Sequence, residues 1–327
     1  MKEFLRLIRW KNLVIIVMTM VLMRYAIIEP LISKISIIPV SGALTEVPME
    51  LQSPWYDFVI LVIATLLITA GGYVINDYFD IKTDLVNRGE VIVGTKIPRR
   101  KAMMWHNYLN LGGVAAGFYI SWKAGYFWLG MLFLVVSGLL YFYSASYKRQ
   151  FLIGNVIVAI LTAMVPMLVV IYEWPALYRY YEINAIETPD FNLILYWVGG
   201  FAIFAFISTL TREIIKDIED FEGDSAYGRN TVPVAIGILS SKIVSVCLIL
   251  VMIAMLYAVW YLFIHDIITL IYLSVAIVLP LVIVTGLVAV SKTKIHLHRA
   301  GNLIKIVMLT GILYSVVVKI ILDNNLF

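Results

Sequence analysis

Residues 57–84 read DFVILVIATLLITAGGYVINDYFDIKTD, an apolar run that passes directly into a cluster of carboxylates. The apolar part, 57–76, matches the ~20 residues that an α-helix needs to cross the hydrocarbon core of a bilayer. It carries one charged side chain, Asp57, at its start. The stretch therefore predicts a membrane-spanning helix that ends in an acidic motif.

The composition indicates that the whole chain is a membrane protein. Of the 327 residues, 62% are hydrophobic and 14% are charged, whereas globular domains carry ~25% charged residues. So few charged side chains cannot coat a soluble protein of this size. The single cysteine, Cys247, excludes a disulfide framework and a cysteine-based metal site within one chain. The net charge of +4 is modest, and we expect membrane lipid as a partner and no nucleic acid.

Nine apolar runs are long enough to form transmembrane helices. They predict an all-α, polytopic fold with a single transmembrane domain over 1–327. The first run has no small-residue cleavage site and other runs follow it, so we expect a helix there rather than a signal peptide. The runs lie near 12–29, 57–76, 104–122, 125–143, 151–172, 191–211, 241–263, 267–289 and 303–322.

The distribution of basic residues predicts an orientation. With a cytoplasmic N-terminus, 20 of the 25 Lys and Arg residues lie on the cytoplasmic side, as the positive-inside rule requires. We therefore expect a multi-pass protein of the plasma (inner) membrane. The five basic residues left for the outer side are Arg24, Lys34, Lys123, Arg179 and Lys319. The outer segments 30–56 and 173–190 also hold aromatic residues that suit an interfacial belt, namely Trp55, Tyr56, Trp174, Tyr178, Tyr180 and Tyr181.

Two acidic motifs follow the second and sixth runs, on the same predicted cytoplasmic face. On a helix, Asn76, Asp80 and Asp84 recur at i, i+4 and i+8 and form one acidic ridge. The second ridge has i, i+3, i+7 spacing and consists of Asp217, Asp220 and Asp224. Asn76 and Asp220 are separated by 144 residues, as are Asp80 and Asp224, which suggests two halves related by duplication.

Like charges at these spacings repel one another, and a bound divalent cation would remove the repulsion. Carboxylate and amide oxygens are hard ligands of the kind that Mg²⁺ takes, together with water and substrate phosphate oxygens. Both ridges lack Cys and His, which argues against zinc or copper. Either motif alone is equally well explained as solvated surface, but two on one face favour a metal site.

Basic residues near both motifs predict contacts with phosphate. Arg88 follows the first motif, Arg229 follows the second, and Lys148 and Arg149 lie in the short loop between the fourth and fifth runs. Arg can bind phosphate through two donors and Lys as a point charge. The positive-inside rule is the alternative explanation for the same residues.

The motifs resemble those of the UbiA superfamily of intramembrane prenyltransferases. The resemblance rests on Asn76-Asp77-Tyr78-Phe79-Asp80 with Asp84 and Arg88, then on Lys216 to Asp224, and on Gly228-Arg229-x-Thr231-x-Pro233. Together with the nine runs it covers nearly the whole chain. It implies nine helices around a central cavity that the two acidic loops cap.

The resemblance also implies roles for particular residues. Mg²⁺ would be held against a prenyl diphosphate by Asn76, Asp80, Asp84, Asp220 and Asp224, with help from Asp217. Of these, Asp80, Asp84, Asp220 and Asp224 would be catalytic. The substrate would be bound by Arg88, Lys148, Arg149 and Arg229, with Tyr143 and Asn155 as polar groups near the cavity.

The implied activity is Mg²⁺-dependent transfer of a prenyl group, with geranylgeranyl diphosphate as the expected donor. The second motif is most similar to the branch whose acceptor is geranylgeranylglyceryl phosphate. An aromatic or quinone precursor, of the 4-hydroxybenzoate or menaquinone type, is the alternative acceptor. From a different class, an ion-coupled secondary transporter would also place acids in membrane helices, and a non-catalytic scaffold would leave the paired motifs unexplained.

Overall fold

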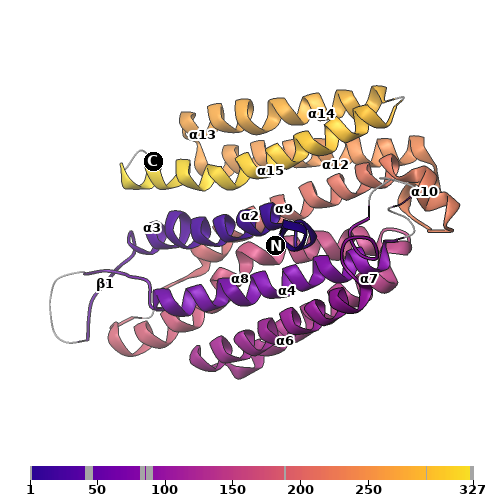
Figure 1. Ribbon diagram of the computed structural model, residues 1–327. Helices are drawn as coiled ribbons and strands as arrows, with labels where there is room; N and C mark the ends of the chain where they lie inside the picture. The colour runs from indigo at the N-terminus through magenta and orange to yellow at the C-terminus, as the bar shows by residue number, and fades with distance from the viewer. Residues whose placement is uncertain are drawn as a thin grey trace.

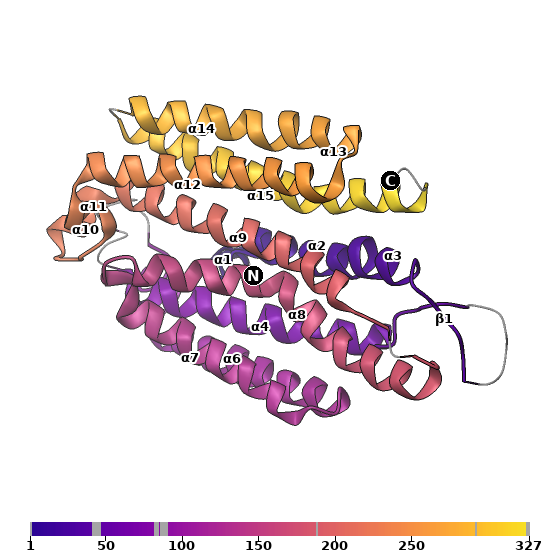
Figure 2. The same cartoon turned by 180° about the vertical axis from the view of Figure 1, so that it is seen from behind.

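The computed structural model describes residues 2–40, 47–81, 85, 91–187, 189–291 and 293–324. Long helices lie side by side and give the molecule two ends (Figure 1). The short helices α10 and α11 mark one end and β1 marks the other, in both views (Figure 2).

The elements are α1 (Lys2–Leu7), α2 (Trp10–Leu22), η1 (Met23–Ile28), α3 (Glu29–Ile32), β1 (Ser36–Ile37), β2 (Val47–Pro48), α4 (Trp55–Phe79), α6 (Arg99–Lys123), η2 (Phe127–Leu129), α7 (Gly130–Ala145), η3 (Tyr147–Arg149), α8 (Ile153–Asn184), α9 (Asn192–Glu219), α10 (Phe221–Ala226), α11 (Val232–Ile236), α12 (Ile238–Val259), η4 (Trp260–Ile264), α13 (Ile267–Tyr272), η5 (Leu273–Val278), α14 (Leu279–Val290) and α15 (Lys294–Asp323).

The structure confirms an all-α, polytopic membrane fold. Within the described residues, a long helix occupies each of the nine predicted runs. Eight of these helices are both long and apolar enough to cross a membrane. The remaining one, α6, has 25 residues but a more polar composition.

The polar side chains on the inner face of α6 are satisfied by its neighbours, which allows this face to pack against α4 and α7. His106 Nδ1 lies 2.9 Å from the carbonyl oxygen of Gly71 on α4. Asn110 donates to the carbonyl of His106 at 2.9 Å and accepts from Ser137 of α7 at 2.6 Å. Internal hydrogen bonds of this kind are required where no water is available.

Glycines bring α4 and α6 close together. A Cβ added to Gly113 of α6 would lie 2.6 Å from Ile68 Cγ1 and 3.1 Å from the carbonyl oxygen of Ala64, both on α4. Small residues at helix contacts in membranes serve this close approach. The α4–α6 contact therefore depends on the missing side chain at 113.

Two apolar clusters form most of the core, and α9 contributes to both. Its N-terminal half supplies Ile194 and Val198 to a cluster with α2, η1, α4 and α8. Its C-terminal half supplies Ile214 and Ile215 to a cluster with α12, α14 and α15. The helix that leads into the second acidic motif is thus packed on both sides.

At the end marked by β1, the fifth helix extends further than its apolar run predicts. We expected a loop over 173–190, but α8 continues to Asn184. Glu173 explains the difference, because its Oε1 accepts from the backbone N–H groups of Gln52 and Ser53 at 2.9 and 3.0 Å. Its Oε2 lies 3.3 Å from Arg24, so a charge that suggested a loop is buried and paired.

The aromatic belt stays a prediction, and the side chains assigned to it differ in exposure. Trp55 and Tyr180 are 68% and 47% exposed. Tyr181 is 3% exposed, and its hydroxyl accepts from the backbone N–H of Glu50 at 2.8 Å. Tyr181 therefore fixes the segment after β2 to α8.

A substitution on α6 tests the close contact with α4. Gly113→Ala should destabilise the protein by about 1–3 kcal/mol, because the added methyl group overpacks against Ile68. Gly138→Ala on α7 is the matched control: nothing lies within 4 Å of its added Cβ, and Ala favours a helix by about 0.5–1 kcal/mol over Gly. Thermal unfolding in detergent measures both. Equal midpoints for the two variants would contradict the contact.

Candidate active site

Each acidic motif begins at the C-terminal end of a long helix. Asp80 follows the last residue of α4 with φ −90° and ψ 2°, and its N–H donates to the carbonyl of Asn76 at 3.1 Å. Asp220 follows the last residue of α9 with φ −89° and ψ 5°, and its N–H donates to the carbonyl of Lys216 at 2.9 Å. The two aspartates occupy equivalent positions.

The helix ends correct the predicted second ridge. Asp80 and Asp220 share this helix-end position and are 140 residues apart, whereas the predicted repeat has a separation of 144 residues and stays a prediction. The second ridge is not one continuous helix, since α9 ends at Glu219 and α10 begins at Phe221. Asp favours helix ends over helix interiors because its side chain competes for backbone hydrogen bonds, so both helices stop at the motif.

Asp80 is the centre of a buried ionic cluster. Its Oδ1 lies 2.7 Å from Lys148 Nζ and 2.8 Å from a terminal guanidinium nitrogen of Arg229. Lys148 also donates to Asn76 Oδ1 at 3.3 Å. The three charged side chains are only 6–12% exposed.

Arg229 joins the two acidic motifs. One terminal nitrogen contacts Asp80, and the other lies 3.4 Å from Oδ1 of Asp224. The backbone holds this arrangement, because the N–H of Arg229 donates to the carbonyl of Asp224 at 2.9 Å. Gly228 has φ +64°, a conformation that Gly adopts without strain.

Lys148 is held in place by close backbone packing. A Cβ on Gly154 would lie 2.7 Å from the Lys148 Cα, so the start of α8 can approach η3 only because residue 154 is Gly. The neighbouring Arg149 accepts from the N–H of Asn230 through its carbonyl at 2.9 Å. The side chain of Arg149 is exposed, which separates it from the ionic cluster.

Burial and charge shift the pKa values of the cluster. Burial alone would raise the pKa of Asp80, but Lys148 and Arg229 together hold it below its usual value. Burial lowers the pKa of Lys148 to about 8 although Asp80 opposes the shift. Burial also raises the pKa of Asp224, and the Asp220 carboxylate adds to this effect while Arg229 opposes it. The two carboxylates therefore differ, because the nearby cations outweigh burial at Asp80 and burial outweighs Arg229 at Asp224.

The remaining predicted residues lie around this cluster at differing distances from it. Asn155 donates to Asp217 Oδ2 at 2.8 Å, so this pair forms a separate contact between α8 and α9. Tyr143 lies within electrostatic range of Asp80 and Asp217. Asp84 and Arg88 lie outside the described residues.

Arg9 is a residue of this end that the sequence did not single out. It contacts Asp77 Oδ1 at 3.0 Å, and its guanidinium lies 4.9 Å from the ring centroid of Tyr73. Arg9 has φ 51°, where α1 turns into α2. No local pattern distinguishes it from the other basic residues near the N-terminus, because its partner is 68 residues away.

The described residues do not bring three His, Cys, Asp or Glu side chains close enough to hold a metal ion by themselves. The available donors are the oxygens of Asn76, Asp80, Asp220 and Asp224. These hard donors fit Mg²⁺, which uses one or two carboxylates and completes its shell with water and substrate phosphates. The arrangement suits a metal shared with an anionic ligand rather than one enclosed by protein.

The comparisons with known proteins agree with this chemistry. The sequence profile described as the UbiA prenyltransferase family matches residues 38–297. The digeranylgeranylglyceryl phosphate synthase of Methanosphaera stadtmanae is 30% identical over 257 residues, which are 78% of this chain and 85% of that protein. The chain spans 54–56% of the length of three further relatives of the same name, from Thermococcus and Pyrococcus species.

Solved structures share the fold. The structure described as "Structural and mechanistic insights into the biosynthesis of Digeranylgeranylglyceryl phosphate synthase in membranes" has a TM-score of 0.63 at 22% identity, with 96% of this chain and 98% of that chain covered. A UbiA homologue from Archaeoglobus fulgidus bound to GPP and Mg²⁺ has a TM-score of 0.56 at 17% identity, with 96% and 99% covered.

Neutralising Asp80 should destabilise the protein. Asp80→Asn leaves the buried cations of Lys148 and Arg229 without their shared partner, and breaking a buried ion pair costs about 3 kcal/mol or more. The matched control is Asp77→Asn, whose partner Arg9 is 35% exposed, so that its loss costs at most about 1 kcal/mol. Thermal unfolding without added metal measures both variants. An Asp80→Asn midpoint equal to that of Asp77→Asn would exclude the ionic cluster.

Proposed function

The chain belongs to the UbiA prenyltransferase family, and from this we propose that it transfers a prenyl group from a prenyl diphosphate to a membrane-associated acceptor. We propose geranylgeranyl diphosphate as the donor and geranylgeranylglyceryl phosphate as the acceptor. The products are the lipid ether and diphosphate.

One observation carries the proposal, namely the contact of both acidic motifs with Arg229. Asp80 and Asp224 come from helices far apart in sequence, and Arg229 binds both of them beside Lys148. Carboxylates supply ligands for a metal, and Arg and Lys supply donors for phosphate oxygens. A diphosphate complexed with Mg²⁺ needs both kinds of group in one place.

Mg²⁺ is proposed as the metal on the chemistry of the donors. Asp80, Asp220 and Asp224 provide oxygen ligands, and burial raises the pKa of Asp224 although Arg229 opposes the shift. The Archaeoglobus fulgidus homologue was bound to GPP and Mg²⁺, which supports the same pair of ligands here. Bound Mg²⁺ would supply Lewis-acid and electrostatic stabilisation of the departing diphosphate.

The chain's own residues have two tasks in this reaction. Lys148 and Arg229 bind phosphate oxygens, for which they exchange part of their contact with Asp80. The helices around them exclude water, so that the allylic cation meets the acceptor rather than water. The allylic C–O bond breaks with its electron pair on the diphosphate oxygen, the acceptor hydroxyl oxygen forms the new ether bond, and the hydroxyl proton leaves with the diphosphate.

The acceptor is proposed from the relatives named digeranylgeranylglyceryl phosphate synthase and from the second motif. The Methanosphaera stadtmanae relative covers most of this chain. The second motif carries Arg212 and Lys216 next to Glu213, with both cations at the acidic end. An anionic acceptor suits such a surface.

Removing Asp220 should abolish transfer without unfolding the protein. Among the described contacts, the Asp220 side chain has no ion pair to lose, so Asp220→Asn should keep the wild-type unfolding midpoint. Transfer from geranylgeranyl diphosphate should fall by at least about 100-fold, because the developing charge on diphosphate loses its stabilisation. Asp190→Asn at the opposite end is the control and should keep full activity.

Purified protein should be assayed with labelled geranylgeranyl diphosphate, with and without Mg²⁺, against geranylgeranylglyceryl phosphate and against 4-hydroxybenzoate. A Mg²⁺-dependent lipid ether is the expected product. A prenylated aromatic acid alone would replace the proposed acceptor. Full activity of Asp220→Asn would exclude the proposed role of the second motif.

We further propose that residues 1–327 form one domain in the plasma membrane. In this orientation the N-terminus and both acidic motifs lie on the cytoplasmic side. The surplus of Lys and Arg at this end supports that orientation.

Cysteine labelling tests the orientation. In a Cys247→Ser background, Ser33→Cys and Ser225→Cys place exposed thiols at opposite ends of the bundle. A membrane-impermeant maleimide should label Ser33→Cys in intact cells and Ser225→Cys only after the membrane is opened. Labelling in the reverse order would invert the proposed orientation.

A further inference from the structure

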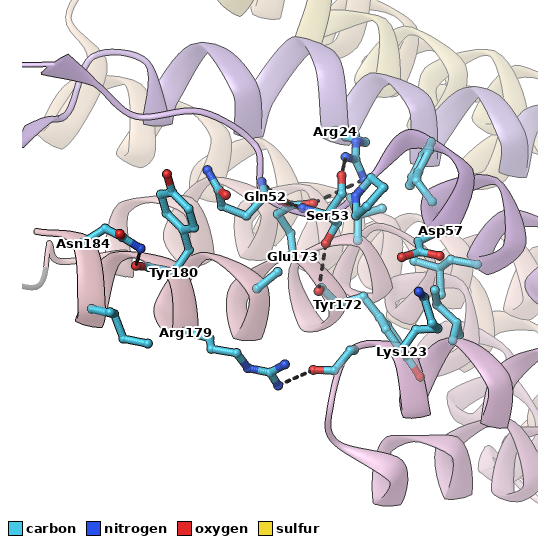
Figure 3. Close-up of a pocket in the computed structure, with 18 residues that line it drawn as sticks. Arg24, Gln52, Ser53, Asp57, Lys123, Tyr172, Glu173, Arg179, Tyr180 and Asn184 are labelled. Carbon is cyan, nitrogen blue, oxygen red and sulfur yellow. Dashed lines mark hydrogen bonds and ion pairs between the residues drawn. The ribbon is translucent and has the colours of Figure 1, made fainter.

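A cavity of about 420 Å³ lies at the end opposite the acidic motifs. It is bounded by α4, α6, α8 and the segment that precedes α4 (Figure 3). Its walls combine apolar side chains such as Phe58, Leu61 and Ile120 with charged ones. Ligand cavities typically have this size and mixture.

The charged residues of the cavity include three of the five basic residues predicted for the outer side. Arg24, Lys123 and Arg179 all line it, and they come from three different helical segments. The positive-inside rule explains why basic residues are few at this end, but it does not explain why they converge. Convergent cations in a cavity favour an anionic group.

The three basic side chains differ in the contacts that they already make within the protein. Arg24 is 3% exposed and is paired with Glu173 at 3.3 Å, so it belongs to the protein framework. Arg179 donates through one nitrogen to the carbonyl of Ala124 at 2.7 Å and keeps other donors. Lys123 is exposed at the end of α6, and the described contacts give it no ion pair. Lys123 and Arg179 are therefore available to an anion.

Asp57 lines the same cavity, and its carboxylate needs a hydrogen-bond donor rather than an anion. Its side chain lines the cavity, the residue is 9% exposed, and Oδ1 has no hydrogen-bond partner among the described residues. A buried acceptor without a donor costs about 1–3 kcal/mol or more. The ligand therefore needs a hydrogen-bond donor as well as an anionic group.

The surroundings of the cavity place it at the level of lipid headgroups. Exposed aromatic side chains lie on the same end of the elements that form it, and such rings mark membrane–water interfaces. The set comprises Trp55, Tyr56, Trp122, Tyr126, Tyr178 and Tyr180, each between 42% and 68% exposed. At this depth, phosphate groups are attached to lipids.

We propose that this cavity binds the headgroup of a membrane phospholipid, with the phosphate at Lys123 and Arg179 and a headgroup N–H or O–H donating to Asp57. The apolar wall formed by Phe58, Leu61 and Ile120 accommodates the first carbons of the acyl chain. This site lies at the end opposite Asp80 and Arg229 and is independent of the proposed prenyl transfer.

Retention of lipid by the purified full-length protein tests the proposal. Native mass spectrometry, without prenyl substrates or Mg²⁺, would count bound lipid after the addition of phosphatidylethanolamine or phosphatidylcholine with the same acyl chains. The two lipids share a phosphate and zero net charge, but only the ethanolamine headgroup carries N–H donors. The wild-type protein should retain phosphatidylethanolamine several-fold more than phosphatidylcholine, since one hydrogen bond to a charged group is worth about tenfold.

Two variants separate the two halves of the site. Lys123→Gln should lower retention of both lipids about tenfold. Asp57→Leu should remove the preference for phosphatidylethanolamine. The matched control is Lys34→Gln, which removes an exposed cation at the same end outside the cavity and should change neither result. Thermal unfolding confirms that each variant is folded.

Several outcomes would overturn the assignment. One is equal retention by the wild-type protein and Lys123→Gln, and another is an equal loss in Lys34→Gln. Binding of inorganic phosphate as tightly as phosphatidylethanolamine would identify a free anion site instead of a lipid site. Because no step measures prenyl transfer, failure of the proposed enzymatic function would leave this test intact.

Discussion

The Asp80 carboxylate lies where two unfavourable effects meet, and the end of the structure that carries both acidic motifs depends on how these effects are offset. It follows the C-terminus of α4, where the helix dipole is negative. It is also largely removed from water, which disfavours its charge. Lys148 and Arg229 supply the positive charge that such a position requires. The loops that carry these cations must therefore fold back over the end of α4.

The same constraint applies to the second motif and explains why the motifs face each other. Asp220 ends α9 in the same backbone conformation as Asp80 ends α4, so two negative helix ends and several carboxylates converge. Arg229 is shared between Asp80 and Asp224, and one guanidinium cannot neutralise this whole cluster. In the proposed reaction, a divalent cation would offset the carboxylate charge that Lys148 and Arg229 leave, together with the charge of the diphosphate.

The sequence predicted the features that depend on residue type and failed on those that depend on distant partners. Apolar runs located the helices, and the two acidic motifs with the basic residues near them included Asp80, Asp224, Lys148 and Arg229, which the structure brings together. It could not anticipate the contact between Arg9 and Asp77, because 68 residues separate them and nothing local marks either one. Glu173 misled the prediction for the same reason: its partners Arg24, Gln52 and Ser53 are remote, so a buried charge resembled the start of a loop.

The charged side chains are thus paired differently at the two ends of the helix bundle. Near Asp80, the basic side chains contact carboxylates and offset the negative charge at the helix C-termini. Near Asp57, a buried carboxylate and the exposed Lys123 line one cavity without a contact between them. A buried acceptor without a hydrogen-bond donor lowers the stability of the fold. Among the described contacts, Lys123 does not donate to Asp57. A donor from outside the chain would remove this cost, and in the proposed site the lipid headgroup supplies it.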